Sequence, residues 1–202
     1  MKRQILLFVI MLSAVSVTAQ TYWDSSRPDH RFTFGIRAGG NFSKVFHDND
    51  EWRYHLGYQA GLTADVNLVR SLSVGAGVYY IQKGFKLEVE VTPSDVLEFE
   101  YTPSYIEIPL QLSYHIKLSD SSQFHLHAGG YYAAGIKSSD ENFFRDYDGY
   151  DSTDFGLILG ASATYDHFYA GASYERGLKN ISTTADDHGY NSSIIISLGY
   201  NF

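Results

Sequence analysis

The sequence has no cysteine among its 202 residues, and only 4 prolines and 2 tryptophans. Without cysteine the chain has no disulfide, no thiolate metal ligand, no cysteine nucleophile and no lipoprotein acylation site. Beyond residue 20, no segment approaches the roughly 18 consecutive apolar residues that a membrane-spanning helix needs. These absences exclude a disulfide-stapled secreted domain, a thiol enzyme and a helical membrane protein.

Catalytic motifs are also missing. There is no GxSxG sequence, no P-loop, no dinucleotide fingerprint and no zincin helix. The formal charge of −8 argues against nucleic acid as a partner. We therefore expect neither an enzyme nor a cofactor, and we expect no nucleic-acid partner.

The chain is rich in aromatic residues and glycine, with 17 Tyr, 13 Phe and 18 Gly. Aromatic and β-branched side chains fit the pleated surface of strands. No segment shows a convincing helical repeat. The composition thus favours an all-β protein.

Residues 1–19 have the features of a secretory signal peptide. Lys2 and Arg3 are followed by an apolar stretch from Ile5 to Val17, and small residues precede a cleavage site near Ala19. Loss of this segment would remove two cations and no acid, changing the charge from −8 to −10. The alternative is an uncleaved anchor helix. Residues 20–202 then form one domain.

Period-two alternation predicts eight strands in that domain. Their ranges are 31–40, 57–68, 71–81, 105–116, 123–133, 154–165, 168–178 and 192–202. Short turns at 69–70, 117–122 and 166–167 alternate with long polar connections at 41–56, 82–104, 134–153 and 179–191. Outer-membrane barrels show this pattern of short periplasmic turns and longer extracellular loops. The fold expected is an eight-stranded, antiparallel, up-and-down transmembrane β-barrel.

The two faces of the predicted strands separate by polarity. On the second strand Leu62, Ala64 and Val66 alternate with Thr63 and Asp65. Small polar residues suit the crowded lumen of an eight-stranded barrel, so the apolar face is assigned to lipid. A soluble lipocalin-like barrel is the alternative, and it would turn its apolar face inward.

Aromatic residues fall at both ends of the apolar face, as in the girdles of membrane barrels. The set beside the short turns is Phe32, Tyr114, Phe124, Tyr165, Phe168 and Phe202, and the set at the other end is Tyr58, Tyr80, Tyr132, Phe155, Tyr174 and Tyr190. Two such bands favour the membrane barrel over a soluble core.

Three stretches resemble the PorT-like outer-membrane β-barrel family of Gram-negative bacteria. They are FGIRAGGNFSKV near the start, SYIEIPLQLSYHIKL in the middle and LGYNF at the end. The resemblance implies a barrel in the outer membrane but no single activity, and one namesake group works in protein secretion and gliding. Phe202, with Tyr200 and Leu198 at alternate positions, is similar to the signal read by the barrel-assembly machinery.

Candidate lumen residues are of two kinds. Arg37, Asp65, Glu107 and Glu175 are expected inside the barrel as paired charges, since an unpaired buried charge is costly. His115, His125 and His127 are expected to share one inner surface, with His115 opposite His125. The three imidazoles are a weak candidate metal or pH-responsive site; ordinary packing is favoured.

Two segments outside the barrel carry clustered acids. Residues 85–103 predict a hairpin above the membrane, with Glu88 near Glu100 and Glu90 near Glu98. A divalent cation or a basic partner would relieve this like-charge opposition. The sequence DYDGYDSTD at 146–154 lacks the spacing of a calcium loop and predicts a solvated acidic loop.

The function expected from the sequence is a structural or interaction role exercised through the extracellular loops. Its partners would be outer-membrane lipid, the barrel-assembly machinery during biogenesis and an unidentified envelope protein. Two alternatives stay open: a narrow channel or small-ligand-binding barrel, and a secretion-machinery component of the PorT type.

Overall fold

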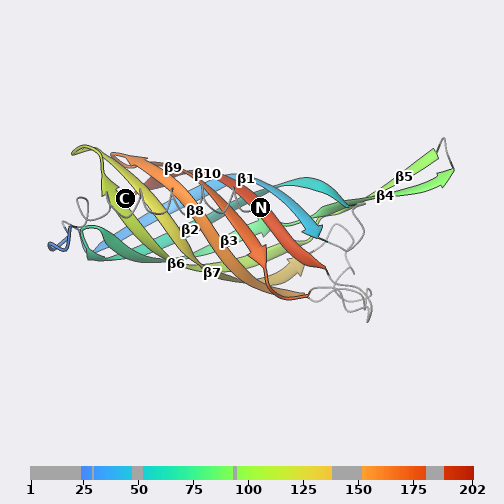
Figure 1. Cartoon of the computed structure of the whole chain (residues 1–202), viewed down its shortest axis with the longest axis horizontal. Helices are drawn as coiled ribbons and strands as arrows, with labels where there is room; N and C mark the ends of the chain where they lie inside the picture. The colour runs from blue at the N-terminus through green and yellow to red at the C-terminus, as the bar shows by residue number, and fades with distance from the viewer. Residues whose placement is uncertain (1–23, 29, 47–51, 93–94, 138–151, 181–188) are drawn as a thin grey trace, which may run out of the picture.

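The computed structural model describes residues 24–28, 30–46, 52–92, 95–137, 152–180 and 189–202. Within them, eight antiparallel strands close into a barrel (Figure 1). These are β1 (Phe32–Phe46), β2 (Trp52–Val69), β3 (Leu72–Gln82), β6 (Ser104–Lys117), β7 (Ser122–Lys137), β8 (Thr153–Tyr165), β9 (Phe168–Gly177) and β10 (Tyr190–Asn201). No helix in the described part of the chain is long and apolar enough to cross a membrane.

The barrel is closed by pairing of its first and last strands. β1 pairs with β10 from Gly35–Asn201 to Phe46–Tyr190, and on its other side with β2. Every barrel strand therefore has two neighbours, so backbone hydrogen bonds are satisfied within the ladder. The eight strands predicted from the alternation are all present.

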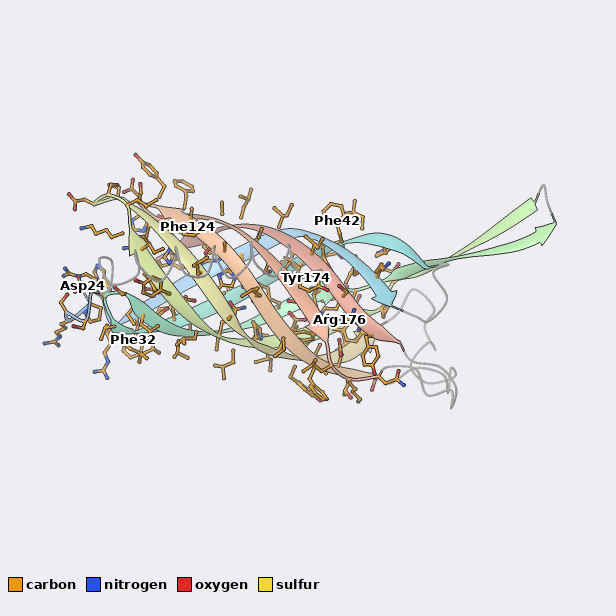
Figure 2. All side chains as sticks on the ribbon, viewed as in Figure 1. Asp24, Phe32, Phe42, Phe124, Tyr174 and Arg176 are labelled. Atoms are coloured by element: carbon orange, nitrogen blue, oxygen red, sulfur yellow. The ribbon has the colours of Figure 1, made fainter. Side chains whose placement is uncertain are left out.

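Apolar side chains point outward, as the alternation predicts. Leu62, Leu110 and Leu198 are 64%, 60% and 66% exposed, whereas Arg37 and Glu107 are 7% and 2% exposed inside the barrel. Figure 2 shows side chains standing out along the whole barrel. A continuous apolar exterior of this size is unsuited to water and suits lipid.

Several strands are longer than predicted. β1 continues to Phe46 and β7 to Lys137, so the expected connections 41–56 and 134–153 contain strand residues. Apolar alternation marks only the part of a strand whose outer face is apolar. The ladder itself continues through the polar residues beyond it. Residues 1–19 and most of the acidic segment 146–154 lie outside the described residues.

Aromatic rings cluster where the predicted girdles lie. Beside the short turns, Tyr200 contacts Phe168 and Phe202 with ring-centroid distances of 5.7 and 5.5 Å. Toward the long connections, Tyr58 stacks on Tyr80 at 5.8 Å. Register brings Tyr200 beside Phe168 and Tyr58 near Tyr80, whereas Tyr200 and Phe202 lie two residues apart in the chain, at and just beyond the end of β10.

The remaining two strands form a hairpin outside the barrel. β4 (Phe85–Thr92) and β5 (Asp95–Tyr101) project beyond the rim at the end with the long connections (Figure 1). The register corrects the predicted pairing, because Glu88 lies opposite Glu98, while Glu100 lies opposite Lys86 and Glu90 opposite Val96. The hairpin was predicted correctly, but its register is shifted by two residues because a sequence alone does not fix where the turn lies.

Candidate functional site in the barrel lumen

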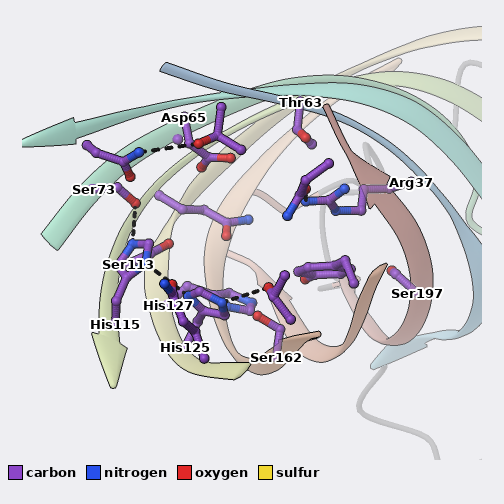
Figure 3. A pocket seen from close by; sticks show the side chains of 18 of the residues that line it. Arg37, Thr63, Asp65, Ser73, Ser113, His115, His125, His127, Ser162 and Ser197 are labelled. Carbon is purple, nitrogen blue, oxygen red and sulfur yellow. Dashed lines mark hydrogen bonds between the residues drawn. The ribbon is translucent and has the colours of Figure 1, made fainter. Parts of the chain in front are cut away.

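The lumen contains a cavity of about 870 Å³ that opens at the end with the short turns. We call it the vestibule. Its walls are polar and come from most barrel strands; they include Arg37, Gln59, Asp65, Gln111, His115, His125, Tyr169 and Asn201 (Figure 3). At the mouth, the hydrogen bond that Lys117 donates to Asp120 lowers the pKa of Asp120. The vestibule is large enough for several waters or a small polar solute.

Arg37 is held against the vestibule wall. Its guanidinium donates to the Asn201 Oδ1 at 2.6 Å and to the Ile36 carbonyl at 3.1 Å, and it lies over the Tyr169 ring at 3.9 Å. Asp65 lines the same cavity, but among the described residues the two form no ion pair. Of the four predicted lumen charges, Arg37 and Asp65 thus line the vestibule without pairing with each other, and Glu107 and Glu175 belong to a separate cluster.

The histidines form a hydrogen-bonded chain across the wall. His115 lies opposite His125 as predicted, and their Nδ1 atoms are 3.1 Å apart. His115 Nε2 contacts Ser73 Oγ at 2.7 Å, and His125 Nε2 contacts Thr164 Oγ1 at 2.8 Å. A bond between two imidazole nitrogens requires that at least one is an unprotonated acceptor.

No metal site follows from this arrangement. The nitrogens of both rings already have protein partners, and His127 packs separately, 7% exposed, beside Gly160. The described residues contain no group of three or more His, Cys, Asp or Glu placed to hold a metal ion. The histidines contribute a hydrogen-bond network to the wall.

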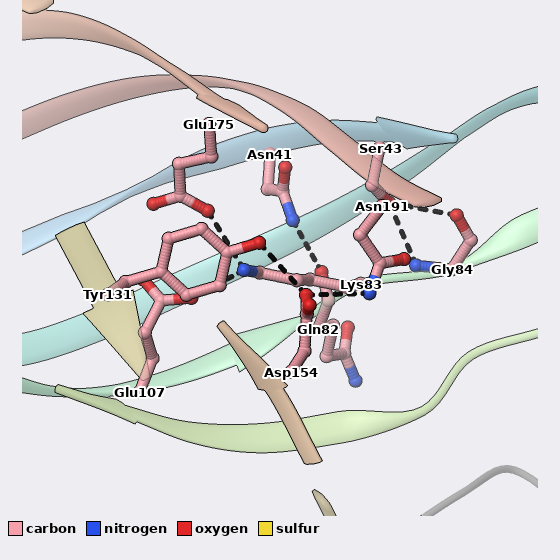
Figure 4. A network of polar contacts seen from close by, with 10 residues as sticks. All are labelled: Asn41, Ser43, Gln82, Lys83, Gly84, Glu107, Tyr131, Asp154, Glu175 and Asn191. Atoms are coloured by element: carbon pink, nitrogen blue, oxygen red, sulfur yellow. Dashed lines mark hydrogen bonds and ion pairs between the residues drawn. The ribbon is translucent and has the colours of Figure 1, made fainter. Parts of the chain in front are cut away.

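A buried ion-pair cluster contains Glu107 and Glu175, which also line the vestibule (Figure 4). The ammonium of Lys83 lies 2.5 Å from Glu107 Oε2 and 2.9 Å from Glu175 Oε2, and all three side chains are at most 3% exposed. It also lies over the ring of Tyr131 at 3.9 Å. Two of the predicted lumen charges thus meet, and their common partner is Lys83, which lies in the predicted connection 82–104.

A third carboxylate lies beside this cluster. Asp154 is fully buried and accepts hydrogen bonds from the Tyr131 hydroxyl and the Asn191 amide, each at 2.9 Å. The predicted solvated acidic loop is therefore wrong for Asp154, which begins the inward face of β8. One ammonium faces three carboxyl groups, so the cluster attracts positive charge.

The backbone that carries Lys83 is folded into the lumen. Asn41 Nδ2 donates to the Gln82 carbonyl at 2.7 Å. Ser43 Oγ donates to the Gly84 carbonyl at 2.9 Å and accepts from the Gly84 amide at 2.8 Å. The Lys83 amide donates to the Pro103 carbonyl at 3.0 Å. We call residues 82–84 the plug.

A signal for Lys83 exists in the sequence. Ser73, Gly75, Gly77, Tyr79 and Ile81 alternate on the inner face of β3, and residue 83 continues the same parity. The strand prediction stopped at residue 81 because the lipid-facing apolar positions end there. Extending the alternation by two residues would have placed Lys83 in the lumen.

The chain is similar to known proteins in one family model and in several solved structures. No curated protein matches the chain in sequence. Similar solved structures include the outer membrane protein OprG of Pseudomonas aeruginosa (15% identity, 89% of this chain and 99% of that chain, TM-score 0.48). Neisserial surface protein A is 16% identical, with 84% of this chain and 97% of that chain covered and a TM-score of 0.46. The attachment invasion locus protein Ail of Yersinia pestis is 14% identical, with 86% of this chain and 100% of that chain covered and a TM-score of 0.42. The family model "Outer membrane protein beta-barrel domain" matches residues 18–183, and this chain therefore belongs to that family of outer-membrane β-barrels.

Proposed function

We propose that this barrel has an interaction role rather than a catalytic one, and that the β4–β5 hairpin is its contact surface. The observation that carries the proposal is that the hairpin leaves the barrel and stands beyond its rim (Figure 1). In barrels of this type the long connections lie on the extracellular side. The hairpin would then face the cell exterior.

The hairpin has strand edges available for pairing. In the described residues β5 pairs only with β4, and β4 pairs with β2 only from Phe85 to Leu87. An unpaired edge is a template for adding another strand, and proteins that bind extended peptides use it in this way.

The acidic residues of the hairpin favour a basic partner. β5 contains Asp95, Glu98 and Glu100, and Glu98 lies opposite Glu88 of β4. Like charges directly opposite one another destabilise a strand pair. A basic, extended segment of an envelope protein would both complete the edge and relieve this repulsion.

The test uses the purified barrel in nanodiscs of zwitterionic lipid and an alternating Lys–Val peptide with a fluorescent label. We expect binding that is lost on Glu98→Lys/Glu100→Lys and on replacement of residues 86–100 by a short turn. The matched probe is the same peptide with backbone N-methyl groups, which keeps the charge but removes strand pairing. Equal binding of both peptides, or of neither, would refute strand addition.

Two narrower roles have their own support. The vestibule favours a small-ligand-binding barrel, and titration with small polar solutes followed by tyrosine fluorescence would test it. Membership of the PorT-like group, with a role in secretion, rests on the three quoted stretches. The other two proposed partners are membrane lipid, which would cover the apolar exterior, and the barrel-assembly machinery, which would recognise Phe202.

A further inference from the structure

We propose that the plug is hinged: when the base of the β4–β5 hairpin lifts, Lys83 leaves Glu107 and Glu175 and a passage for small cations opens through the barrel. The inference is independent of what binds the hairpin. It adds a gated permeation function to the interaction role proposed above.

The plug lies at the point where the lumen is closed. Glu107 and Glu175 line the inner end of the vestibule, and the Lys83 ammonium bridges them. Lys83 is the largest side chain that is less than 2% exposed in the described residues. Its withdrawal removes the charge that bridges the two acids and one of the buried side chains at this level, which Lys83 shares with Ile81, Tyr131, Ile158 and Ile195.

The plug is also one of the two roots of the hairpin, the other being residues 102–103 between β5 and β6. β3 ends at Gln82 and β4 begins at Phe85, so residues 82–84 are the only covalent link from β3 to the hairpin. β4 is attached to the barrel ladder by three residue pairs, from Trp52–Leu87 to Tyr54–Phe85. Along the chain from β4, a displacement of the hairpin reaches Gly84 first.

The plug lies where the β3–β6 ladder ends, with Gln82 still paired to Ser104 and the Lys83 amide donating to the Pro103 carbonyl. Asn41 and Ser43 hold residues 82 and 84 by side-chain hydrogen bonds. Figure 4 shows these contacts on the side of the plug away from Glu107 and Glu175. Such contacts break individually, whereas strands of a closed barrel separate only together.

The chemistry of the opened passage follows from the carboxyl groups left behind. Without the ammonium, Glu107, Glu175 and Asp154 form a cluster of acids on the lumen wall, from β6, β9 and β8 respectively, exposed to the water that enters the passage. Acidic side chains that line a pore select cations. In the closed state Lys83 occupies this cluster as a tethered cation, which shows that the cluster accommodates one.

Ion conductance in planar bilayers tests the plug directly. We expect no step currents from the wild type, and step currents from Lys83→Ala whose reversal potential in a KCl gradient moves toward that of K⁺. Lys117→Ala, which removes an exposed lysine at a turn, is the matched control and stays silent. Folding of each variant is verified by its gel shift on boiling. A folded but silent Lys83→Ala protein would overturn the proposal.

Because Lys83→Ala leaves buried carboxylates unpaired, that variant can fail to fold. Lys83→Ala/Glu107→Gln/Glu175→Gln removes the charges together and keeps the side-chain shapes of the two acids. We expect it to conduct with reduced cation selectivity. Silence of this folded triple variant would show that Lys83 does not close the lumen, and unchanged selectivity would show that the two acids do not select the ion.

The hinge is tested by locking it. In Asn41→Ala/Ser43→Cys/Gly84→Cys the two introduced cysteines are the only ones in the chain. Under reducing conditions, loss of the Asn41 and Ser43 hydrogen bonds should produce step currents that the wild type lacks. Oxidation should abolish the openings and reduction should restore them. Openings that persist in the oxidised protein would refute lifting of the hairpin base.

Discussion

Leu62 and Thr63 are neighbours on β2 that face different media. Leu62 is 64% exposed on the apolar exterior, whereas the Thr63 hydroxyl is buried in the wall of the vestibule. Asp65 lies two residues further along the same inner face. Substitutions at these two residues therefore compare the lipid-facing and lumen-facing sides of the barrel at nearly the same depth in the membrane.

The first prediction uses this pair. Leu62→Arg places a charge in lipid near mid-membrane, where the cost is about 2–4 kcal/mol, and should clearly lower the refolding yield into lipid vesicles. Thr63→Arg points toward water and Asp65, so its yield should fall less. If Thr63→Arg proved the worse of the two, the inside-outside assignment of β2 would be reversed.

The second prediction concerns Gly39 and Gly40 of β1. A Cβ at Gly39 would collide with the Ile196 carbonyl across the strand pair, whereas a Cβ at Gly40 meets nothing within 4 Å. Gly39→Ala should destabilise the barrel by about 1–3 kcal/mol because the backbones must separate. Gly40→Ala should be neutral or stabilising by about 0.5 kcal/mol, since it restricts the unfolded chain. Urea unfolding in vesicles measures both, and equal effects would contradict the close approach of β1 and β10.

The third prediction addresses the histidine chain. His125→Leu leaves His115 Nδ1 and the Thr164 hydroxyl without their partner, which should cost about 1–3 kcal/mol of unfolding free energy. His30→Leu is the control, because the His30 side chain is exposed and, among the described residues, only the His30 carbonyl takes part in a hydrogen bond. The measurement is again urea unfolding. An His125→Leu protein as stable as the control would show that the network contributes nothing.

The fourth prediction concerns the end of the chain. The Phe202 amide donates to the Phe34 carbonyl at 2.8 Å, and its ring contacts Tyr200. Phe202→Ser should lower outer-membrane levels and leave degraded protein in the periplasm, as quantitative immunoblots of cell fractions would show. Phe202→Tyr keeps the ring and should restore assembly. Wild-type abundance of Phe202→Ser would show that this residue is no assembly signal.

The fifth prediction follows from closure of the ladder. β1 and β10 pair along nearly their whole length, so the eight barrel strands leave no edge from which the barrel could unfold. The protein should remain folded in mild detergent and migrate differently on gels before and after boiling. Identical migration together with recovery in a soluble fraction would contradict a membrane barrel.

The sequence by itself determined the barrel and its two faces. Side chains of a strand alternate between its two faces, and in β2 apolar and polar or small residues alternate in the same way from Tyr58 to Leu68. The same local pattern placed Arg37, Asp65, Glu107 and Glu175 inside, and the short turn of 117–122 was enough to pair His115 with His125.

Only the tertiary structure decided which lumen residues meet. Glu107 on β6 and Glu175 on β9 are brought to one ammonium by the curvature of the closed barrel, and nothing in either strand specifies the other. The inward fold of residues 82–84 depends on Asn41 and Ser43, which are distant in sequence. The hairpin register likewise depends on where the turn lies. Local periodicity fixes the direction of a side chain, but contacts across a lumen require the closed barrel.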